Sequence, residues 1–460
     1  MPSGASFRYG KDHPVLLAAT RRGVAGFGFT DCFRGGSMAS TDEQRNRRKV
    51  IAAGITGNVL EWYDFAVYGF YAPIIGRLFF PSDDPTVSLI ASFGAFAAGF
   101  MMRPIGGFVF GYIGDKIGRK RALVLSVMLM AIPTGVIGIL PDHATIGIAA
   151  AFLMVGMRML QGLSVGGEYT GSIVYLAEHS PASRRGFFTS WTLFGAVGGI
   201  LLGSGVSALV SGLLTADQVS DWGWRLPFLA GILVGVVGLV IRRHLPDMPE
   251  DEGADKPANP IVEALTTQWR EMLKVIGFNI INAVGFYMMF VYVVTWLIKQ
   301  VKEPRSDALE INTISMAVLL VLIPIFGALS DRIGRKPLLL FGAGGMAILG
   351  YPLIWLMHHP DFMMILAGQL GFALLIGAYF GGAPATLTEM FPRRVRVSAL
   401  SVGYNVGLAI FGGTTPLIAT WLIARTHDDL SIAWYLIACA VVSFLVVLTL
   451  KETAGKPLPD

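Results

Sequence analysis

The chain has 460 residues, of which 53% are hydrophobic and only 15% are charged. With a mean hydropathy of +0.60, this composition excludes a set of water-soluble domains and predicts an integral membrane protein. The formal net charge is +5, but the basic residues lie in short loops between apolar segments, so we expect no nucleic-acid partner. Cys32 and Cys439 have no metal-ligand or CxxC spacing, which predicts no metal site and no disulfide framework.

We predict a disordered cytoplasmic N-terminal extension at 1–49, of which residues 1–37 contain no apolar run long enough for a signal peptide. Met38 stands just before a basic segment that leads into the first apolar span. Our hypothesis is that Met38 is the true start and that residues 1–37 are a disordered extension, with an organelle-targeting peptide as the alternative. Native protein that begins at Met1 by mass spectrometry would contradict this hypothesis.

Twelve apolar segments follow, each near the ~20 residues that a helix needs to cross a bilayer. They are predicted at 51–79, 86–113, 122–140, 145–178, 187–212, 225–242, 271–298, 308–329, 338–356, 362–390, 397–424 and 431–450. The sequence therefore predicts an all-α membrane protein with about twelve transmembrane helices.

A connection rich in Pro, Asp and Glu divides these spans six and six. We expect one six-helix half at 50–243, a cytoplasmic linker at 244–270, a second half at 271–450 and a short cytoplasmic tail at 451–460. Loops after even-numbered spans hold seventeen lysines and arginines, whereas loops after odd-numbered spans hold four. This imbalance predicts that both termini are cytoplasmic.

Two motifs occur once in each half. The pattern G-x-x-x-D-x-x-G-R-K stands at Gly111–Lys120 and again at Gly327–Lys336, and an E-x-x-P motif begins at Glu178 and again at Glu389. Repetition at half the chain length indicates a duplicated bundle.

The first span carries polar side chains at steps of three and four residues, which places them on one helical face. They are Asn58, Glu61, Asp64, Tyr68 and Tyr71. One interpretation is a polar seam against a neighbouring helix. The other is the wall of a watery cavity in which one of the two carboxylates carries a proton.

Further charges lie deep in the second and fourth spans, where each needs a partner. They are Arg103, Arg158 and Glu168, with Gln161 beside them. Arg158 and Glu168 are ten residues apart, roughly 15 Å along a helix, so we expect each to pair with another helix. We favour Arg158 opposite Glu61 or Asp64, and a purely structural ion pair is the alternative.

The second half is poorer in charge and offers amide and aromatic groups instead. They are Asn279, Asn282, Tyr287, Gln369, Tyr379, Tyr404 and Asn405. Coupling chemistry is therefore expected in the first half, while these groups either bind substrate or bond across helices.

The doubled motif resembles the signature turn of the major facilitator superfamily. Arg158-x-x-Gln161-Gly162 resembles the span-4 motif that this superfamily links to proton transfer. The match to metabolite–proton symporters, which include proline/betaine, α-ketoglutarate, citrate and shikimate carriers, covers about residues 50–455. It is carried by the segments Gly57–Phe65, Arg103–Gly107, Gln161–Tyr169 and Trp222–Phe228.

The resemblance implies two six-helix halves and alternating access. It also implies a cytoplasmic charge network that closes that side, formed by Asp115, Arg119, Glu178, Asp331, Arg335 and Glu389. The ending Lys451–Leu458 is similar to the proline/betaine branch but lacks the coiled-coil tail of some osmosensing members.

The leading hypothesis is a proton-coupled symporter in the cell inner membrane that imports a small carboxylate-bearing metabolite, either an organic acid or a zwitterion. Glu61, Asp64 or Glu168 would carry the proton. The predicted substrate residues are Arg103, Arg158, Gln161, Tyr68, Tyr71, Asn282 and Tyr287. We expect a monomer without cofactor or metal, and no enzymatic site.

Two alternatives remain at this stage. A drug–proton antiporter of the same superfamily is disfavoured because span 5 contains no proline, whereas the antiporter motif resembles G-x-x-x-G-P. A membrane sensor that transports nothing would call for a signalling domain, a long tail or the loss of the midplane charges.

Overall fold

The computed structural model describes residues 41–117, 119–243 and 260–459, and the regular structure within these ranges is entirely helical. The chain forms two compact units, Met1–Arg48 and Lys49–Asp460. The second unit contains every feature discussed below. The proposed start at Met38 and the extension 1–37 lie outside the described residues.

The six predicted spans of the first half correspond to long helices, two of them broken into two pieces. These are α1 (Thr41–Phe79), α2 with α3 (Pro85–Met101 and Arg103–Ile117), α4 (Arg119–Ile139), α6 with α7 (Ala149–Val165 and Glu168–Glu178), α8 (Arg185–Leu213) and α10 (Arg225–Arg243). Short elements connect them: α5 (His143–Ile146), η2 (Ala182–Arg184), α9 (Ala216–Gln218) and η3 (Val219–Gly223).

The second half repeats this plan with several π-helical insertions. Its spans are α12 (Trp269–Phe286) with η4 (Tyr287–Tyr292), α13 (Val293–Trp296) and η5 (Leu297–Val301); α14 (Arg305–Ile333); α15 (Arg335–Met357); α16 (Phe362–Glu389); α17 (Arg396–Gly407) with η6 (Leu408–Gly412) and α18 (Gly413–Thr426); and α19 (Ser431–Thr449).

Within the described residues, nine of these continuous helices are long and apolar enough to cross a membrane, and two shorter apolar helices lie at Val124–Ile139 and Arg225–Val237. Together with α1, they match the predicted spans and confirm the all-α membrane fold. The predicted linker contains a helix, α11 (Pro260–Thr267), while residues 244–259 lie outside the described part of the chain.

The breaks in spans 2 and 4 follow from local sequence. Pro104 has no N–H to donate, and it stands at the second position of α3, in the first turn, where a helix needs no such donor. The chain accordingly ends α2 at Met101 and restarts at Arg103. Span 4 breaks at the pair Gly166 and Gly167. The first break lies directly before Arg103 and the second directly before Glu168, two of the charged residues that the sequence analysis singled out.

Glycines bring the helices that carry the two deep arginines into backbone contact. A Cβ atom on Gly162 of α6 would lie 1.7 Å from the carbonyl oxygen of Gly99 on α2. Likewise, a Cβ on Gly199 of α8 would lie 2.3 Å from the carbonyl oxygen of Val59 on α1. Only glycine fits at such approaches, so these positions set how closely α6 meets α2 and α8 meets α1.

The π-helical segment η4 is stabilised by amide side chains from neighbouring helices. Gln369 Nε2 of α16 donates to the carbonyl oxygen of Met289 at 2.9 Å, and Asn312 Nδ2 of α14 donates to that of Phe290 at 3.2 Å. Gln369 also donates to Asn312 Oδ1 at 2.8 Å. The wider π turn leaves carbonyls for side chains to satisfy, which explains why these two amides are buried.

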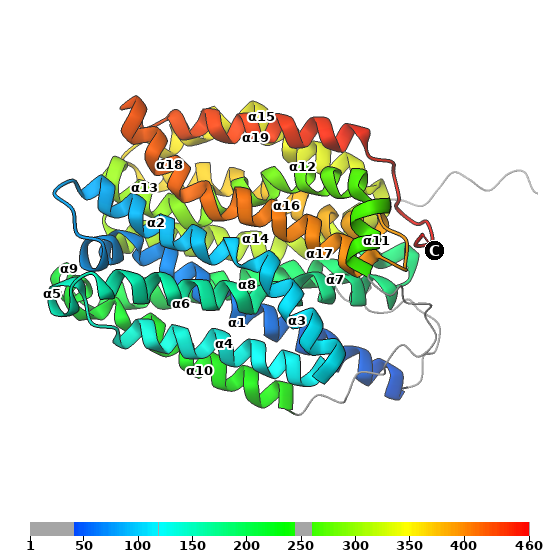
Figure 1. Cartoon of the computed structure of the whole chain (residues 1–460). Helices are drawn as coiled ribbons and strands as arrows, with labels where there is room; N and C mark the ends of the chain where they lie inside the picture. Colours follow the sequence, from blue (N-terminus) through cyan, green and yellow to red (C-terminus); the bar gives the residue numbers. More distant parts are fainter. Residues whose placement is uncertain (1–40, 118, 244–259, 460) are drawn as a thin grey trace, which may run out of the picture. The chain divides into compact units, whose positions relative to one another are not determined.

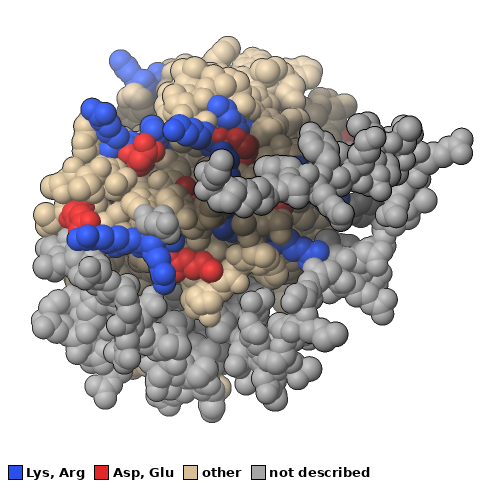
Figure 2. Space-filling model, turned by 90° about the vertical axis from the view of Figure 1, so that its right-hand side faces the viewer, with Lys and Arg blue, Asp and Glu red and all other residues tan. Residues whose placement is uncertain are grey.

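The bundle has two chemically different ends. Figure 1 shows α3, α7 and α11 at one end and α5, α9 and α13 at the other. We call the first the motif end, because the second copy of the repeated motif joins α14 to α15 there, and we call the other the opposite end. Figure 2 views the motif end and shows basic and acidic side chains gathered on it.

Candidate functional site

Arg103, the first residue of α3, forms a buried ion pair with α1. Its Nη2 donates to Glu61 Oε1 at 3.1 Å, and the two residues are 0% and 6% exposed. The guanidinium carbon lies 5.1 Å from the ring centroid of Phe100, 5.2 Å from that of Trp62 and 5.6 Å from that of Phe65. The positive charge of the Arg103 guanidinium is therefore stabilised by one carboxylate and by aromatic faces, whereas hydrocarbon would leave it without partners.

Arg158 of α6 forms a second buried cluster with the same helix. Its Nη1 donates to Gln161 Oε1 at 2.8 Å and lies 3.6 Å from Asp64 Oδ2. Gln161 Nε2 in turn donates to Asp64 Oδ2 and to Thr134 Oγ1, the latter at 3.0 Å. The predicted pairing of Arg158 with an α1 carboxylate is confirmed for Asp64, while Glu61 belongs to Arg103.

The two predicted tyrosines of α1 occupy different environments. The ring centroid of Tyr68 lies 4.5 Å from the Arg158 guanidinium, and its hydroxyl donates to the Ser92 carbonyl oxygen at 3.0 Å. Tyr71 instead lies against Arg305 near the opposite end, with 4.4 Å between guanidinium carbon and ring centroid. Tyr68 therefore lies beside the cluster of Arg158, Gln161 and Asp64, and Tyr71 belongs to a separate contact.

Aromatic rings of the two halves meet beside Arg103. Trp62 stacks on Tyr287 with centroids 6.3 Å apart, and Tyr169 lies 4.9 Å from Tyr404. Several buried donors in this region have no hydrogen-bond acceptor among the described residues: Arg103 Nε and Nη1, Trp62 Nε1 and the Tyr287 hydroxyl. A buried donor without an acceptor is costly, and these donors lie close together, because Trp62 contacts both Arg103 and Tyr287.

Asn282 lies on the second-half side of this region. Its Nδ2 donates to Asn279 Oδ1 at 2.6 Å, and Asn279 Nδ2 donates to the carbonyl oxygen of Tyr404 at 3.3 Å. Asn282 Oδ1 has no donor among the described residues. The structure thus brings Asn282 near Tyr404, for which the sequence left open a substrate contact or a bond across helices.

Three predicted residues cannot be placed. The side chains of Asp115, Arg119 and Glu168 lie outside the described residues, although their backbones belong to α3, α4 and α7. The first copy of the repeated motif therefore has no described side-chain geometry.

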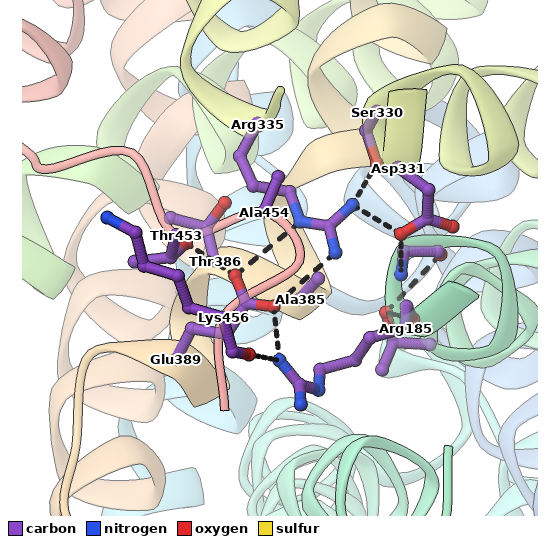
Figure 3. A network of polar contacts seen from close by, with 12 residues as sticks. Arg185, Ser330, Asp331, Arg335, Ala385, Thr386, Glu389, Thr453, Ala454 and Lys456 are labelled. Carbon is purple, nitrogen blue, oxygen red and sulfur yellow. Dashed lines mark hydrogen bonds and ion pairs between the residues drawn. The ribbon is translucent and has the colours of Figure 1, made fainter. Parts of the chain in front are cut away.

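The second copy of the motif joins the two halves at the motif end. Asp331 accepts hydrogen bonds from the backbone N–H groups of Gly186 at 2.8 Å and Phe187 at 2.9 Å, which belong to the first turn of α8. Arg335 Nη1 donates to Asp331 Oδ1 at 2.7 Å. A carboxylate at a helix N-terminus is favourable, so Asp331 stabilises contact between α14 and α8 (Figure 3).

Two reciprocal ion pairs cross the halves at the same end. Arg185 Nη1 donates to Glu389 Oε1 at 2.8 Å, and Arg335 Nη2 lies 3.4 Å from the same oxygen. Arg396 Nη1 donates to Glu178 Oε1 at 2.6 Å. Each glutamate of the repeated E-x-x-P motif thus pairs with an arginine of the other half. In the sequence, Arg185 and Arg396 are two of the basic loop residues that predict topology, and nothing in their spacing predicts these pairs.

The C-terminal tail contributes to this network, which the sequence did not predict. Glu452 accepts hydrogen bonds from the backbone N–H groups of Arg335 at 2.9 Å and Lys336 at 3.0 Å, at the start of α15. Thr453 Oγ1 donates to Glu389 Oε2 at 2.5 Å. The tail is therefore packed onto the motif end.

Backbone carbonyls of the tail accept from both halves. The carbonyl oxygen of Lys456 accepts from Arg185 Nη1 at 3.1 Å, and that of Pro459 accepts from Arg396 Nη2 at 2.7 Å (Figure 3 shows the first of these). No sequence rule places such carbonyls, because their bonds depend only on tertiary packing.

Comparison with known proteins agrees with this architecture. The family model described as sugar (and other) transporter matches residues 49–250 and 252–460. The proline/betaine transporter of Salmonella typhimurium is 37% identical over 436 residues, covering 92% of this chain and 87% of the relative. The proline/betaine transporter of Escherichia coli K12 is 38% identical over 424 residues, which cover 89% of this chain and 85% of the relative.

A third relative, the glycine betaine/proline/ectoine/pipecolic acid transporter OusA of Dickeya dadantii, is 38% identical and covers 89% of this chain and 84% of its own length. Among solved structures, the proton:xylose symporter XylE bound to 6-bromo-6-deoxy-D-glucose has a TM-score of 0.71 at 21% identity, covering 90% of this chain and 98% of that one. The partially occluded, inward-open XylE of E. coli has a TM-score of 0.73 at 20% identity, and the match covers 89% of this chain and 99% of XylE. The chain therefore belongs to the sugar (and other) transporter family and has the fold of the major facilitator superfamily.

Proposed function

We propose that this chain imports a small zwitterionic metabolite together with a proton, by alternating access of one site between its halves. The observation that carries the proposal is the set of buried donors beside Arg103 that have no acceptor among the described residues. They lie where aromatic residues of both halves meet. The relatives named for proline and betaine, both zwitterions, support this substrate class.

A carboxylate would satisfy the unpaired donors. Arg103 presents Nε and Nη1 in addition to the Nη2 that binds Glu61, and a guanidinium edge suits a carboxylate. Trp62 Nε1 offers a further donor on the neighbouring α1 helix. The substrate would then add hydrogen bonds to Arg103 without breaking the ion pair that stabilises it.

The charge balance of the site favours a zwitterion over an organic dianion or trianion. Among the described side chains of this site, Arg103 and Arg158 are matched by Glu61 and Asp64. A zwitterion adds no net charge to this balance, whereas a citrate-like anion would add uncompensated negative charge. The rings of Trp62, Tyr169, Tyr287 and Tyr404 offer faces for an ammonium group.

Asp64 is the residue that we assign to the proton. Its described partners include a neutral amide and Arg158, which also donates to Gln161 Oε1. When Asp64 takes a proton, Arg158 keeps its bond to Gln161, so the guanidinium is never left without an acceptor. Proton exchange at Asp64 therefore avoids the large penalty of uncovering a buried charge.

The contacts at both ends fit an occluded state in this transport cycle. Ion pairs join the halves at the motif end, and Arg305 joins them at the opposite end. We assign the motif end and both termini to the cytoplasm of a bacterial inner membrane, from the distribution of loop lysines and arginines. A monomer that uses the proton gradient, without cofactor, enzymatic activity or nucleic-acid partner, completes the proposal.

Purified protein in liposomes tests this function. A proton gradient directed inward, with the outside more acidic than the lumen, should drive accumulation of labelled betaine or proline. Collapse of this gradient with a protonophore should abolish the accumulation. Citrate, α-ketoglutarate and shikimate form the comparison panel. Accumulation of a dicarboxylate but of no zwitterion would contradict the charge argument, and export of a large hydrophobic cation would favour the antiporter.

A further inference from the structure

Arg305 makes the charged contact at the opposite end that corresponds to the ion pairs at the motif end. It is the first residue of α14 in the second half, and its Nη2 donates to the carbonyl oxygen of Phe70 on α1 at 2.8 Å. Its Nε donates to Ser211 Oγ on α8 at 3.2 Å. The guanidinium carbon lies 4.4 Å from the ring centroid of Tyr71. All three partners belong to the first half.

The position of Arg305 within its own helix makes these contacts informative. A cation in the first turn of a helix faces the positive end of the helix dipole, which is unfavourable. Its hydrogen-bond acceptors, Phe70 and Ser211, come from across the interface between the halves. The arrangement is therefore favourable only while the two halves are together at this end.

Neighbouring residues close the same interface by packing. A Cβ on Gly69 of α1 would lie 2.3 Å from the Val291 side chain of η4, so a larger residue there would require Val291 to move. The rings of Phe93 on α2 and Tyr292 on η4 lie 5.8 Å apart. These contacts and Arg305 separate the aromatic region around Tyr287 from the opposite end.

We propose that Arg305 is a positioning residue that stabilises closure of the opposite end, and that its bonds to Phe70 and Ser211 break each time the site opens to that side. In the transport cycle of the proposed function, on which this role rests, substrate enters from that side. Arg305 would then control how readily the loaded protein closes over its substrate, without touching the substrate itself.

Distance measurements between spin labels test the proposal directly. Asp217 in the first half and Arg425 in the second half are both exposed near the opposite end, so we would label D217C and R425C in a chain with C32S and C439S. The Arg305→Ala variant should shift the distance distribution toward longer values. Arg305→Lys, which keeps the charge and one donor to Phe70, should lie between wild type and Arg305→Ala.

Arg77 provides a matched control. It also carries an arginine charge near the opposite end, but it donates to Ser220 within the first half. Arg77→Ala should therefore leave the distance distribution unchanged. An unchanged distribution in Arg305→Ala, or an equal shift in Arg77→Ala, would overturn the role of Arg305. Ser211→Ala, which removes only the weaker contact, should give a smaller shift and serves if Arg305→Ala does not fold.

Transport by the same variants separates this inference from the proposed function. Arg305→Ala should lower the maximal rate of proton-driven uptake severalfold while the affinity for substrate added from outside changes less. If the wild-type protein transports no zwitterion, the proposed function is wrong. Longer distances in Arg305→Ala would still support the role of Arg305 in closing the opposite end. Normal distances with a lost affinity would instead place Arg305 in the binding site and contradict the positioning role.

Discussion

Arg185 and Glu389 are 204 residues apart in the chain and form an ion pair of 2.8 Å in the interior of the motif end. Glu389 also lies 3.4 Å from Arg335 and accepts a hydrogen bond from Thr453. One carboxylate therefore joins α8 of the first half to α15, α16 and the tail of the second half.

Replacing Glu389 with Gln should favour opening of the motif end. The change leaves the guanidinium groups of Arg185 and Arg335 with less compensation, and breaking one partner of a buried pair costs about 3 kcal/mol. Cysteine accessibility from the motif side measures the opening. Glu178→Gln is the matched variant, because its carboxylate is partly exposed, and it should have a smaller effect. Equal effects would show that burial does not determine the strength of these pairs.

Asp64→Asn should separate exchange from uphill transport. The amide still bonds to Gln161 but cannot release a proton, so proton-driven accumulation should disappear while substrate exchange across the membrane continues. Counterflow and gradient-driven uptake in liposomes distinguish the two activities. Glu61→Gln, by contrast, should mainly weaken substrate binding through Arg103. Full uphill uptake by Asp64→Asn would move the proton to Glu61 or Glu168.

Arg103→Lys should raise the apparent KM about tenfold, equivalent to ~1.4 kcal/mol, because lysine keeps the charge but loses the planar set of donors. Initial-rate uptake over a range of substrate concentrations measures the change. Arg158→Lys is the control, since Arg158 bonds within the Asp64 cluster. An unchanged KM in Arg103→Lys would place the carboxylate elsewhere.

Tyr404→Leu should reduce the affinity for betaine roughly fivefold, since one aromatic face is worth about 1 kcal/mol to a cation. Tyr404→Phe retains the ring and should bind betaine almost as wild type does. Competition by betaine against labelled proline reports both variants. A loss in Tyr404→Phe equal to that in Tyr404→Leu would assign the effect to the hydroxyl.

Acid should release the tail from α15. Burial acts to raise the pKa of Glu452, but hydrogen bonds from the backbone N–H groups of Ala454, Arg335, Lys336 and Thr453 outweigh it, and the net pKa is lowered. A lowered pKa in the folded state means that this contribution is present above the ordinary value of about 4.3 and is lost as the pH falls below it. Proteolysis of the tail against pH measures the release. In Glu452→Gln, cleavage should no longer depend on pH in this range.

Much of this architecture can be predicted from physical rules that act locally. Apolar length alone places the spans, because a helix must match the bilayer. The cost of a buried charge predicts that Arg158 pairs with a carboxylate of α1. Which of the two carboxylates faces Arg158 depends on how α1 packs against its neighbours: Asp64 takes that place while Glu61 pairs with Arg103, and no pattern in one sequence reveals this.

Other parts of the site depend on tertiary context. Thr134 is an ordinary hydroxyl in an apolar span, and only the position of Gln161 makes it part of the Asp64 cluster. Arg185, Arg305 and Arg396 have the sequence signature of loop charges that set topology. Their partners lie in the other half of the chain, so spacing along the sequence could not identify them.

The π-helical segment η4 also sets an angular offset within span 7. Tyr287, beside the candidate substrate region, is its first residue, and Val291 and Tyr292 near the opposite end are its last. Each residue turns an α-helix by about 100°, so the additional residue of a π turn rotates everything beyond it relative to Tyr287. Deleting one residue between 288 and 292 would therefore turn α13, which packs on α14, relative to α12. Span 7 thus presents two surfaces at a fixed angle, one at Tyr287 beside Trp62 and the other at Val291 and Tyr292 beside Gly69 and Phe93.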